Sequence, residues 1–270
     1  MLTGHWVHAV FARAMILGTA VLALALPRSA AAQQPAQGTE TPSGWTFSIT
    51  PYLWMSGVSG TLDTKRGGSA SFDQSFTDIL DKLHGMPFMG IAEARYDRFS
   101  IVGDIIYLPV GVALQSRDGT FATGSVNINT TIGTTAAYYR ILESGANSID
   151  IGGGVRAYGV SNAVRFSDRR GRRDSFSTWS AWADPLISLR AHADLGNSFG
   201  VSFYGDVGGF GVGSASQLSW QLIGSLDYQL TQAIVLRAGY RYLAMNLDRQ
   251  NDVTFDMRIG GPFLAATFRF

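Results

Sequence analysis

From residue 44 to the end of the chain, apolar and polar side chains alternate with a period of two along most of the sequence. Residues 216–230 show the pattern most clearly, because Leu218 and Trp220 alternate with Gln217 and Ser219. Such alternation predicts β-strands that have one apolar face and one polar face. Ten segments carry it: 44–63, 86–98, 99–115, 120–141, 147–166, 178–194, 197–213, 216–230, 233–249 and 252–270.

The first 32 residues have the features of a cleaved secretory signal peptide. Arg13 precedes an apolar run over residues 15–26, Pro27 ends that run, and small residues lead up to Ala32, after which we expect cleavage. The run is shorter than the roughly 20 residues that a membrane-spanning helix needs. Residues 33–43 are polar and predict a disordered leader, which leaves 44–270 as one β-domain.

The expected strands are too long for an ordinary soluble β-protein, whose strands are commonly about 5–6 residues long. A tilted strand crosses the apolar core of a membrane in about 9–11 residues. No long apolar run follows the signal peptide, so a membrane protein with this sequence must be a β-barrel. The fold class expected is therefore all-β: a transmembrane, antiparallel, up-and-down barrel of about ten strands. Eight or twelve strands remain possible, because 64–85 is hard to assign.

Charge and composition exclude several classes of partner. The chain has 21 Lys and Arg against 20 Asp and Glu, and removal of Arg13 and Arg28 with the signal gives 19 − 20 = −1. We therefore expect no nucleic-acid partner, because such partners require a basic face. There is no cysteine, and only His84 and His192 remain after processing. We expect no metal site and no cofactor.

If the apolar faces meet lipid, including the face of 120–141 that carries Ile128 and Ile132, the opposite faces line the barrel interior. Aromatic residues are then expected in girdles at the membrane surface: Trp45, Tyr138, Tyr139, Tyr228, Tyr240 and Tyr242. The charges on these inner faces balance, which predicts a network of bidentate ion pairs. A barrel of about eight strands has just enough room for its side chains, and wide channels need about 16 strands. Ten strands therefore predict a narrow or blocked lumen, and the spacing leaves open whether its charges are structural or line a selective pore. The expected lumen residues are Glu93, Arg95, Asp104, Asp150, Arg156, Asp184, Arg190, Asp206, Asp227, Arg237, Arg241 and Arg269.

Two segments between the expected strands are candidates for outer loops with roles of their own. Within Ser75–Leu83, the apolar residues recur at helical spacing, which predicts a short amphipathic helix with Thr77 as its N-cap. This helix in the first outer loop is a candidate plug or lid. A second loop is rich in arginine and could bind lipopolysaccharide phosphates, or it could be a solvated hairpin tip. The residues are Phe76, Ile79, Leu80 and Leu83 for the plug or lid, and Arg165, Arg169, Arg170, Arg172 and Arg173 for the basic loop.

Six sequence motifs stand out along the chain: Thr50–Trp54, Phe76–Asp81, Ala183–Pro185, Asp206–Ser214, Gly239–Leu243 and Gly261–Phe270. Together they resemble a widespread, largely uncharacterised family of proteobacterial outer-membrane β-barrel proteins. The resemblance covers nearly all of the mature chain and is weakest at 141–178. It implies the barrel fold and the bacterial outer membrane, but no catalytic residue. The terminal strand, with Phe268 and Phe270, also resembles the signal read by the barrel-assembly machinery of Gram-negative bacteria.

The preferred hypothesis is a small, non-enzymatic outer-membrane barrel. It would be structural, or a narrow porin-like passive pore with a largely filled lumen. A first alternative is a selective small-molecule channel or carrier gated by the 64–85 segment. A second is a lipid or peptide hydrolase with His192 as base. Ser188 lies about 13 Å from His192 at roughly 3.3 Å per residue, so Asp206 or Ser202 would have to assist. An adhesin, a phage receptor, a soluble periplasmic β-protein and the oligomeric state stay open.

The glycine-rich stretch Gly208–Gly213 has only a superficial likeness to a phosphate-binding loop. Such a loop opens a helix, whose first N–H groups bind the phosphate, and no helix is expected here. We expect these glycines to relieve crowding or to form a bulge near the outer rim.

Overall fold

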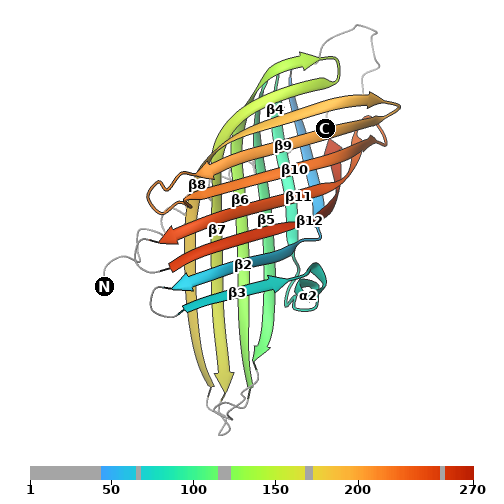
Figure 1. The fold of residues 1–270 in the computed structure, drawn as a ribbon. Helices are drawn as coiled ribbons and strands as arrows, with labels where there is room; N and C mark the ends of the chain where they lie inside the picture. Colours follow the sequence, from blue (N-terminus) through green and yellow to red (C-terminus); the bar gives the residue numbers. More distant parts are fainter. Residues whose placement is uncertain (1–43, 65–67, 115–122, 168–172, 250–252) are drawn as a thin grey trace. The chain divides into compact units, whose positions relative to one another are not determined.

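Ten antiparallel strands close into a barrel in the computed structural model, which describes residues 44–64, 68–114, 123–167, 173–249 and 253–270 (Figure 1). The pairing of β1 with β12 closes the ring, so the predicted fold class is confirmed. The predicted signal peptide and leader lie outside the described residues. The barrel strands are β1 (Trp45–Trp54), β4 (Phe88–Tyr96), β5 (Phe99–Leu114), β6 (Thr123–Ser144), β7 (Asn147–Ser167), β8 (Arg173–Gly196), β9 (Phe199–Gly209), β10 (Leu218–Gln229), β11 (Ile234–Arg249) and β12 (Val253–Arg269).

The two ends of the barrel differ. One end, here called the turn end, carries the short connections 97–98, 145–146, 197–198 and 230–233, together with the start of β1 and the end of β12. The opposite end, here called the loop end, carries the other connections. There β6, β7 and β8, of 22, 21 and 24 residues, project beyond the rest of the wall (Figure 1).

The segment 44–63 forms two strands instead of the single one expected. β1 ends at Trp54, and β2 (Gly57–Thr64) continues along the same partner, β12, after a break at residues 55–56. Opposite the break, Pro262 has no N–H to donate to the ladder. A Cβ on Gly261 would lie 2.2 Å from the carbonyl oxygen of Met55, so only glycine allows this close approach. β2 then turns back into β3 (Gly68–Gln74), a strand that the sequence did not predict.

The predicted helix exists but is shorter than expected. α2 spans Phe76–Leu80, and its N-cap is Ser75 instead of Thr77. The Ser75 hydroxyl accepts from the Asp78 N–H, and the Asp78 carboxylate accepts from the Ser75 N–H at 2.9 Å, which makes a capping box. Leu83, expected within the helix, instead pairs as a bridge with Val110 on β5. None of the described helices is long and apolar enough to cross a membrane.

The outer surface of the barrel is strongly apolar. Outward side chains such as Ile49, Leu53 and Leu222 are 44–49% exposed, and many others like them cover the wall. So continuous an apolar surface is stable in lipid and would be unstable in water. Aromatic pairs lie at the turn end, where Trp45 packs on Tyr96 with ring centres 5.3 Å apart. Phe99–Tyr139 and Phe199–Tyr228 are similar pairs and complete a girdle.

Two residues face the opposite way from the prediction. Ile132, on the face of β6 expected to meet lipid, is 3% exposed and packs inside the barrel. Tyr138, expected in the outer aromatic girdle, is also 3% exposed and lies under the Arg190 guanidinium, 3.9 Å from its ring centre. Both errors have one cause, because the lumen contains apolar as well as polar side chains.

Candidate functional site

The lumen contains a cavity of about 640 Å³ at the turn end, here called the chamber. Its lining reaches Gly145 and Ala146 in the β6–β7 turn and Phe270 at the chain end, so it opens at the turn end. At its inner limit it is lined by Tyr52, Asp104 and other polar residues in the middle of the barrel. Every barrel strand contributes to the wall around it.

Buried polar residues form a belt across the middle of the lumen. Arg241 on β11 donates to Asp104 on β5 at 2.7 Å and to the Tyr52 hydroxyl on β1 at 2.8 Å. Because β12, β1 and β4 separate β11 from β5 in the wall, the bond between Arg241 and Asp104 spans the interior. The Arg241 guanidinium also stacks 4.9 Å from the Trp54 ring.

Gln221 on β10 joins this bridge to a second buried ion pair. Its carbonyl oxygen accepts from Arg241 Nε at 3.0 Å, and its amide nitrogen donates to Asp206 at 3.4 Å. Asp206 pairs with Arg156, and both side chains are fully buried. Asp206 also accepts from the Tyr204 hydroxyl at 2.6 Å. The belt thus runs from β7 across to β5, and its residues line the inner limit of the chamber.

Beyond the belt, toward the loop end, the interior is filled by an apolar cluster. Tyr158 stacks on Trp182 with ring centres 4.9 Å apart, and Leu243 is fully buried. Asp184, fully buried on this side, accepts from the Ser216 N–H at 2.7 Å. The cluster consists of Trp54, Ile106, Ile132, Tyr158, Trp182, Leu243, Met245, Leu247, Ile259 and Phe263.

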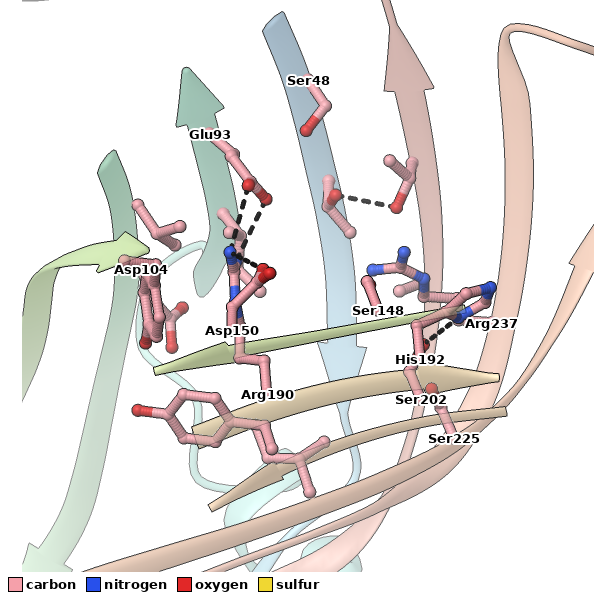
Figure 2. Close-up of a pocket in the computed structure, with 18 of the residues that line it drawn as sticks. Ser48, Glu93, Asp104, Ser148, Asp150, Arg190, His192, Ser202, Ser225 and Arg237 are labelled. Carbon is pink, nitrogen blue, oxygen red and sulfur yellow. Dashed lines mark hydrogen bonds and ion pairs between the residues drawn. The ribbon is translucent and has the colours of Figure 1, made fainter. Parts of the chain in front are cut away.

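Inside the chamber, one group of charges is densely paired. Asp150 accepts from Arg95 at 2.9 Å, from Arg140 at 2.9 Å and from Arg190 at 2.8 Å. Glu93 pairs with Arg95 at 3.0 Å and with Arg190 at 3.2 Å. Three strands, β5, β6 and β7, separate β4 from β8 in the wall. The contact between Glu93 and Arg190 is therefore a second link across the interior (Figure 2).

A second group of polar residues surrounds Asp227. Its members His192, Ser202 and Arg237 lie apart from the first group in Figure 2. The Ser202 and Ser225 hydroxyls donate to Asp227 at 2.5 Å and 2.7 Å. His192 Nδ1 lies 3.0 Å from the Ser202 oxygen and 3.6 Å from Asp227. Arg237 Nε also lies 3.6 Å from Asp227.

The order of these groups differs from that of a hydrolase triad. In such a triad the histidine lies between the serine and the acid, so that it can take the serine proton. Here Ser202 lies between His192 and Asp227, and its own proton points at the carboxylate. Asp206, the other partner considered for His192, belongs to the belt instead.

The twelve lumen residues expected from the sequence divide among these features. Asp104, Arg156, Asp206 and Arg241 build the belt. Glu93, Arg95, Asp150 and Arg190 form the first chamber group, and Asp227 and Arg237 belong to the second. Asp184 lies beyond the belt and binds backbone. Arg269 lines the chamber without an ion pair to any described residue.

Sequence reasoning missed the neutral residues of the belt, Tyr52, Tyr204 and Gln221, together with Arg140. Arg140 shares a strand face with Ala136 and Tyr138, both of which line the chamber. If Ala136 and Tyr138 had been predicted to face inward, Arg140 would have been assigned to the lumen as well. Among the described side chains, no group of three or more His, Cys, Asp or Glu is arranged to hold a metal ion.

The plug candidates and Arg165 of the basic loop lie outside the chamber. Ile79 is buried and Leu80 is 50% exposed, and neither they nor Phe76 and Leu83 line the cavity. Because α2 follows β3 and Leu83 bridges to β5, the segment joins the edges of these two strands.

Of the basic loop, the Arg165 side chain is exposed on β7 and the Arg173 backbone begins β8, while the other three arginines fall outside the described residues. Phe268 is 38% exposed, and Phe270, which also borders the chamber at the turn end, is 70% exposed.

Comparison with solved structures places this fold among outer-membrane barrels. The outer membrane protease OmpT from Escherichia coli matches over 87% of this chain and 99% of its own, with a TM-score of 0.50 and 9% identity. Neisserial surface protein A covers 83% of this chain and 97% of its own, at a TM-score of 0.32 and 13% identity. Ail of Yersinia pestis covers 84% and 99%, at a TM-score of 0.33 and 15% identity.

The sequence itself gives no closer relative. No protein-family model matches the chain, and no curated protein matches it significantly. The likeness to OmpT therefore concerns the fold alone. Taken with the closed ring and the apolar outer wall, it defines this chain as a transmembrane β-barrel of the outer-membrane type.

Proposed function

We propose that this protein is a non-enzymatic β-barrel of the bacterial outer membrane whose lumen is closed to solutes. The barrel fold, the apolar wall and the aromatic girdle at the turn end support a membrane location. The expected signal peptide supports export. In this setting the turn end faces the periplasm, because short turns belong to that side of such barrels.

The belt is the observation that carries the closure. Arg241 and Asp104 join opposite walls, and Arg156 and Asp206 fill the space beside them without exposure to solvent. The apolar cluster beyond the belt blocks the same path a second time. Water and ions would therefore have to disrupt both layers to pass.

Single-channel recording in a planar bilayer tests this proposal. The protein is refolded, and its folded state is verified by the shift in gel migration between heated and unheated samples. We expect no steady conductance from the verified barrel. A steady conductance that changes on replacement of Arg237 or Asp206 by Ala would instead mean that the lumen is a water-filled path.

The gated-carrier alternative makes a separate prediction. If the 64–85 segment gates transport, deletion of residues 68–84 should raise the uptake of small solutes by whole cells. Under the closed-lumen proposal, uptake is unchanged, because the belt contains no residue of that segment.

The hydrolase alternative depends on His192. It predicts that His192→Ala abolishes hydrolysis of lipid or peptide esters, with Ser148→Ala as a control in the same chamber. We expect no hydrolysis above background in either variant or in the unaltered protein, because the Ser202 hydroxyl donates its proton to Asp227 and not to His192.

Two partners belong to the same proposal. Phe268 on β12 and Phe270 directly after it, both exposed, are proposed to be read by the barrel-assembly machinery. The basic loop that begins at Arg165 is proposed to contact lipopolysaccharide phosphates at the loop end, because arginine binds phosphate bidentately.

A further inference from the structure

Two arginines in the chamber lack a close carboxylate partner. Arg237 on β11 approaches Asp227 only to 3.6 Å through Nε, and this buried nitrogen makes no hydrogen bond within the described part of the chain. Arg269 on β12 lines the same chamber, and no carboxylate of the described chain lies within 4 Å of it. Arg237 and Arg269 thus bring two positive charges to the lining of one cavity.

The other arginines of the lumen are in a different state. Arg95, Arg140 and Arg190 each donate to Asp150 at 2.8–2.9 Å, and Arg241 donates to Asp104 at 2.7 Å. Paired guanidinium groups are thus the rule in this interior, and Arg237 and Arg269 are its exceptions.

Asp227 carries one negative charge and can balance only one of the two guanidinium groups. Its two oxygens already accept the short hydrogen bonds of Ser202 and Ser225. Two guanidinium charges therefore face one carboxylate, a local balance of 2 − 1 = +1. His192, also 3.6 Å from Asp227, lies on the same side of the chamber and can add a further N–H donor.

The geometry favours an anionic ligand. A guanidinium presents a planar fork of N–H groups that matches the oxygens of phosphate or carboxylate groups. Two such forks facing one space suit an ion with two negative charges. Ser48 and Ser148 also line the chamber and offer hydroxyl donors to it (Figure 2). Because the chamber opens at the turn end, such an ion would enter from there and stop at the belt.

We propose that the chamber is a binding site for a small dianion, a phosphate group or a dicarboxylate, held between Arg237 and Arg269. This assignment goes beyond the proposed closed barrel, because a lumen closed at its middle can still bind a solute from one side.

Isothermal titration of the detergent-solubilised full-length barrel tests the site, with inorganic phosphate and succinate as separate probes. The titrations are made at about pH 8, where phosphate is a dianion, and at constant ionic strength set with chloride. We expect saturable binding of at least one probe at one ion per barrel. Binding of phosphate alone assigns the phosphate class, and binding of succinate alone assigns the dicarboxylate class.

Single substitutions locate the ion. Arg237→Gln and Arg269→Gln should each weaken binding at least about tenfold, as expected for loss of a charge-assisted hydrogen bond. Arg258→Gln is the matched control, because Arg258 is exposed on the same strand as Arg269 and does not line the chamber. If Arg237→Gln fails to fold, Arg269→Gln still decides, because Arg269 is exposed and has no partner to lose.

Two results would overturn the proposal. One is the absence of saturable binding of both probes in the millimolar range by the verified folded barrel. The other is an equal loss of affinity in Arg258→Gln, which would mean that the probes respond to overall charge and not to the chamber.

Discussion

The buried pair of Arg156 and Asp206 gives the sharpest test of how the belt stabilises the barrel. Both side chains are fully buried, and Arg156 also donates to the Thr134 hydroxyl at 3.2 Å. Replacing Arg156 by Met keeps a similar volume but removes the positive charge. Asp206 then stays buried with only the neutral donors Tyr204 and Gln221.

The expected loss follows from the cost of an uncompensated buried charge. Removing one partner of a buried ion pair destabilises a protein by about 3–5 kcal/mol. This is a large share of a typical free energy of unfolding of about 5–15 kcal/mol. Adding Asp206→Asn to Arg156→Met removes the stranded charge as well. The double variant should therefore be more stable than Arg156→Met alone.

Equilibrium unfolding from lipid vesicles, followed by tryptophan fluorescence in urea, measures these free energies. Glu143→Gln serves as the control, because Glu143 pairs with Arg140 at 3.3 Å with 47% of its side chain exposed. Exposed pairs contribute about 0–1 kcal/mol, so this variant should stay close to the unaltered protein. The reasoning fails if Arg156→Met loses less than about 1 kcal/mol, or if the second substitution lowers stability further.

Three further predictions concern parts of the wall outside the belt. Gly152→Ala should cost about 1–3 kcal/mol in the same assay, because the new Cβ would lie 2.5 Å from the Tyr138 ring, whereas Gly133→Ala should be neutral because nothing lies within 4 Å. Phe270→Ser should lower the heat-modifiable, folded fraction in outer-membrane preparations, and Phe210→Ser, at an exposed loop-end position, should leave it unchanged. The Ser75 hydrogen bonds hold the pKa of Asp78 below its usual range. The first turn of α2 should therefore lose amide-exchange protection as the pH falls through that lowered value, and Ser75→Ala should remove the pH dependence.

The barrel and its lumen charges could be predicted because both depend on alternation along single strands. The strand ends agree within a few residues from β4 to β12 in most cases, and the twelve charged residues lie on inner faces or in the interior. The break after Trp54 could not be predicted, because its cause is Gly261 and Pro262 on a strand about 200 positions later in the sequence. β3 was also missed. It pairs with β2, which is a separate strand only because of this break.

The pairing partners of the charges could not be read from the sequence either. Arg241 and Asp104 are 137 positions apart, and Arg190 and Glu93 are 97 apart. Which arginine meets which acid depends on the closure of the ring and on strand stagger. The period of two shows which residues share an inner face. Their contacts across the lumen can be identified only from the three-dimensional structure. Hydrophobicity alone does not separate a lipid-facing side chain from one in an apolar part of the lumen, so the sequence misplaces Ile132 and Tyr138.

The belt divides the interior into two compartments with different chemistry, and this division has a consequence for ligand access. The chamber on one side is charged and opens at the turn end, while the side toward the loop end is filled with apolar rings. A solute bound between Arg237 and Arg269 can therefore arrive and leave only by the turn end. Deletion of residues 68–84 at the loop end should leave both the affinity and the exchange rate of that solute unchanged. A faster exchange after this deletion would mean that the belt opens, and it would support the gated carrier over the closed barrel.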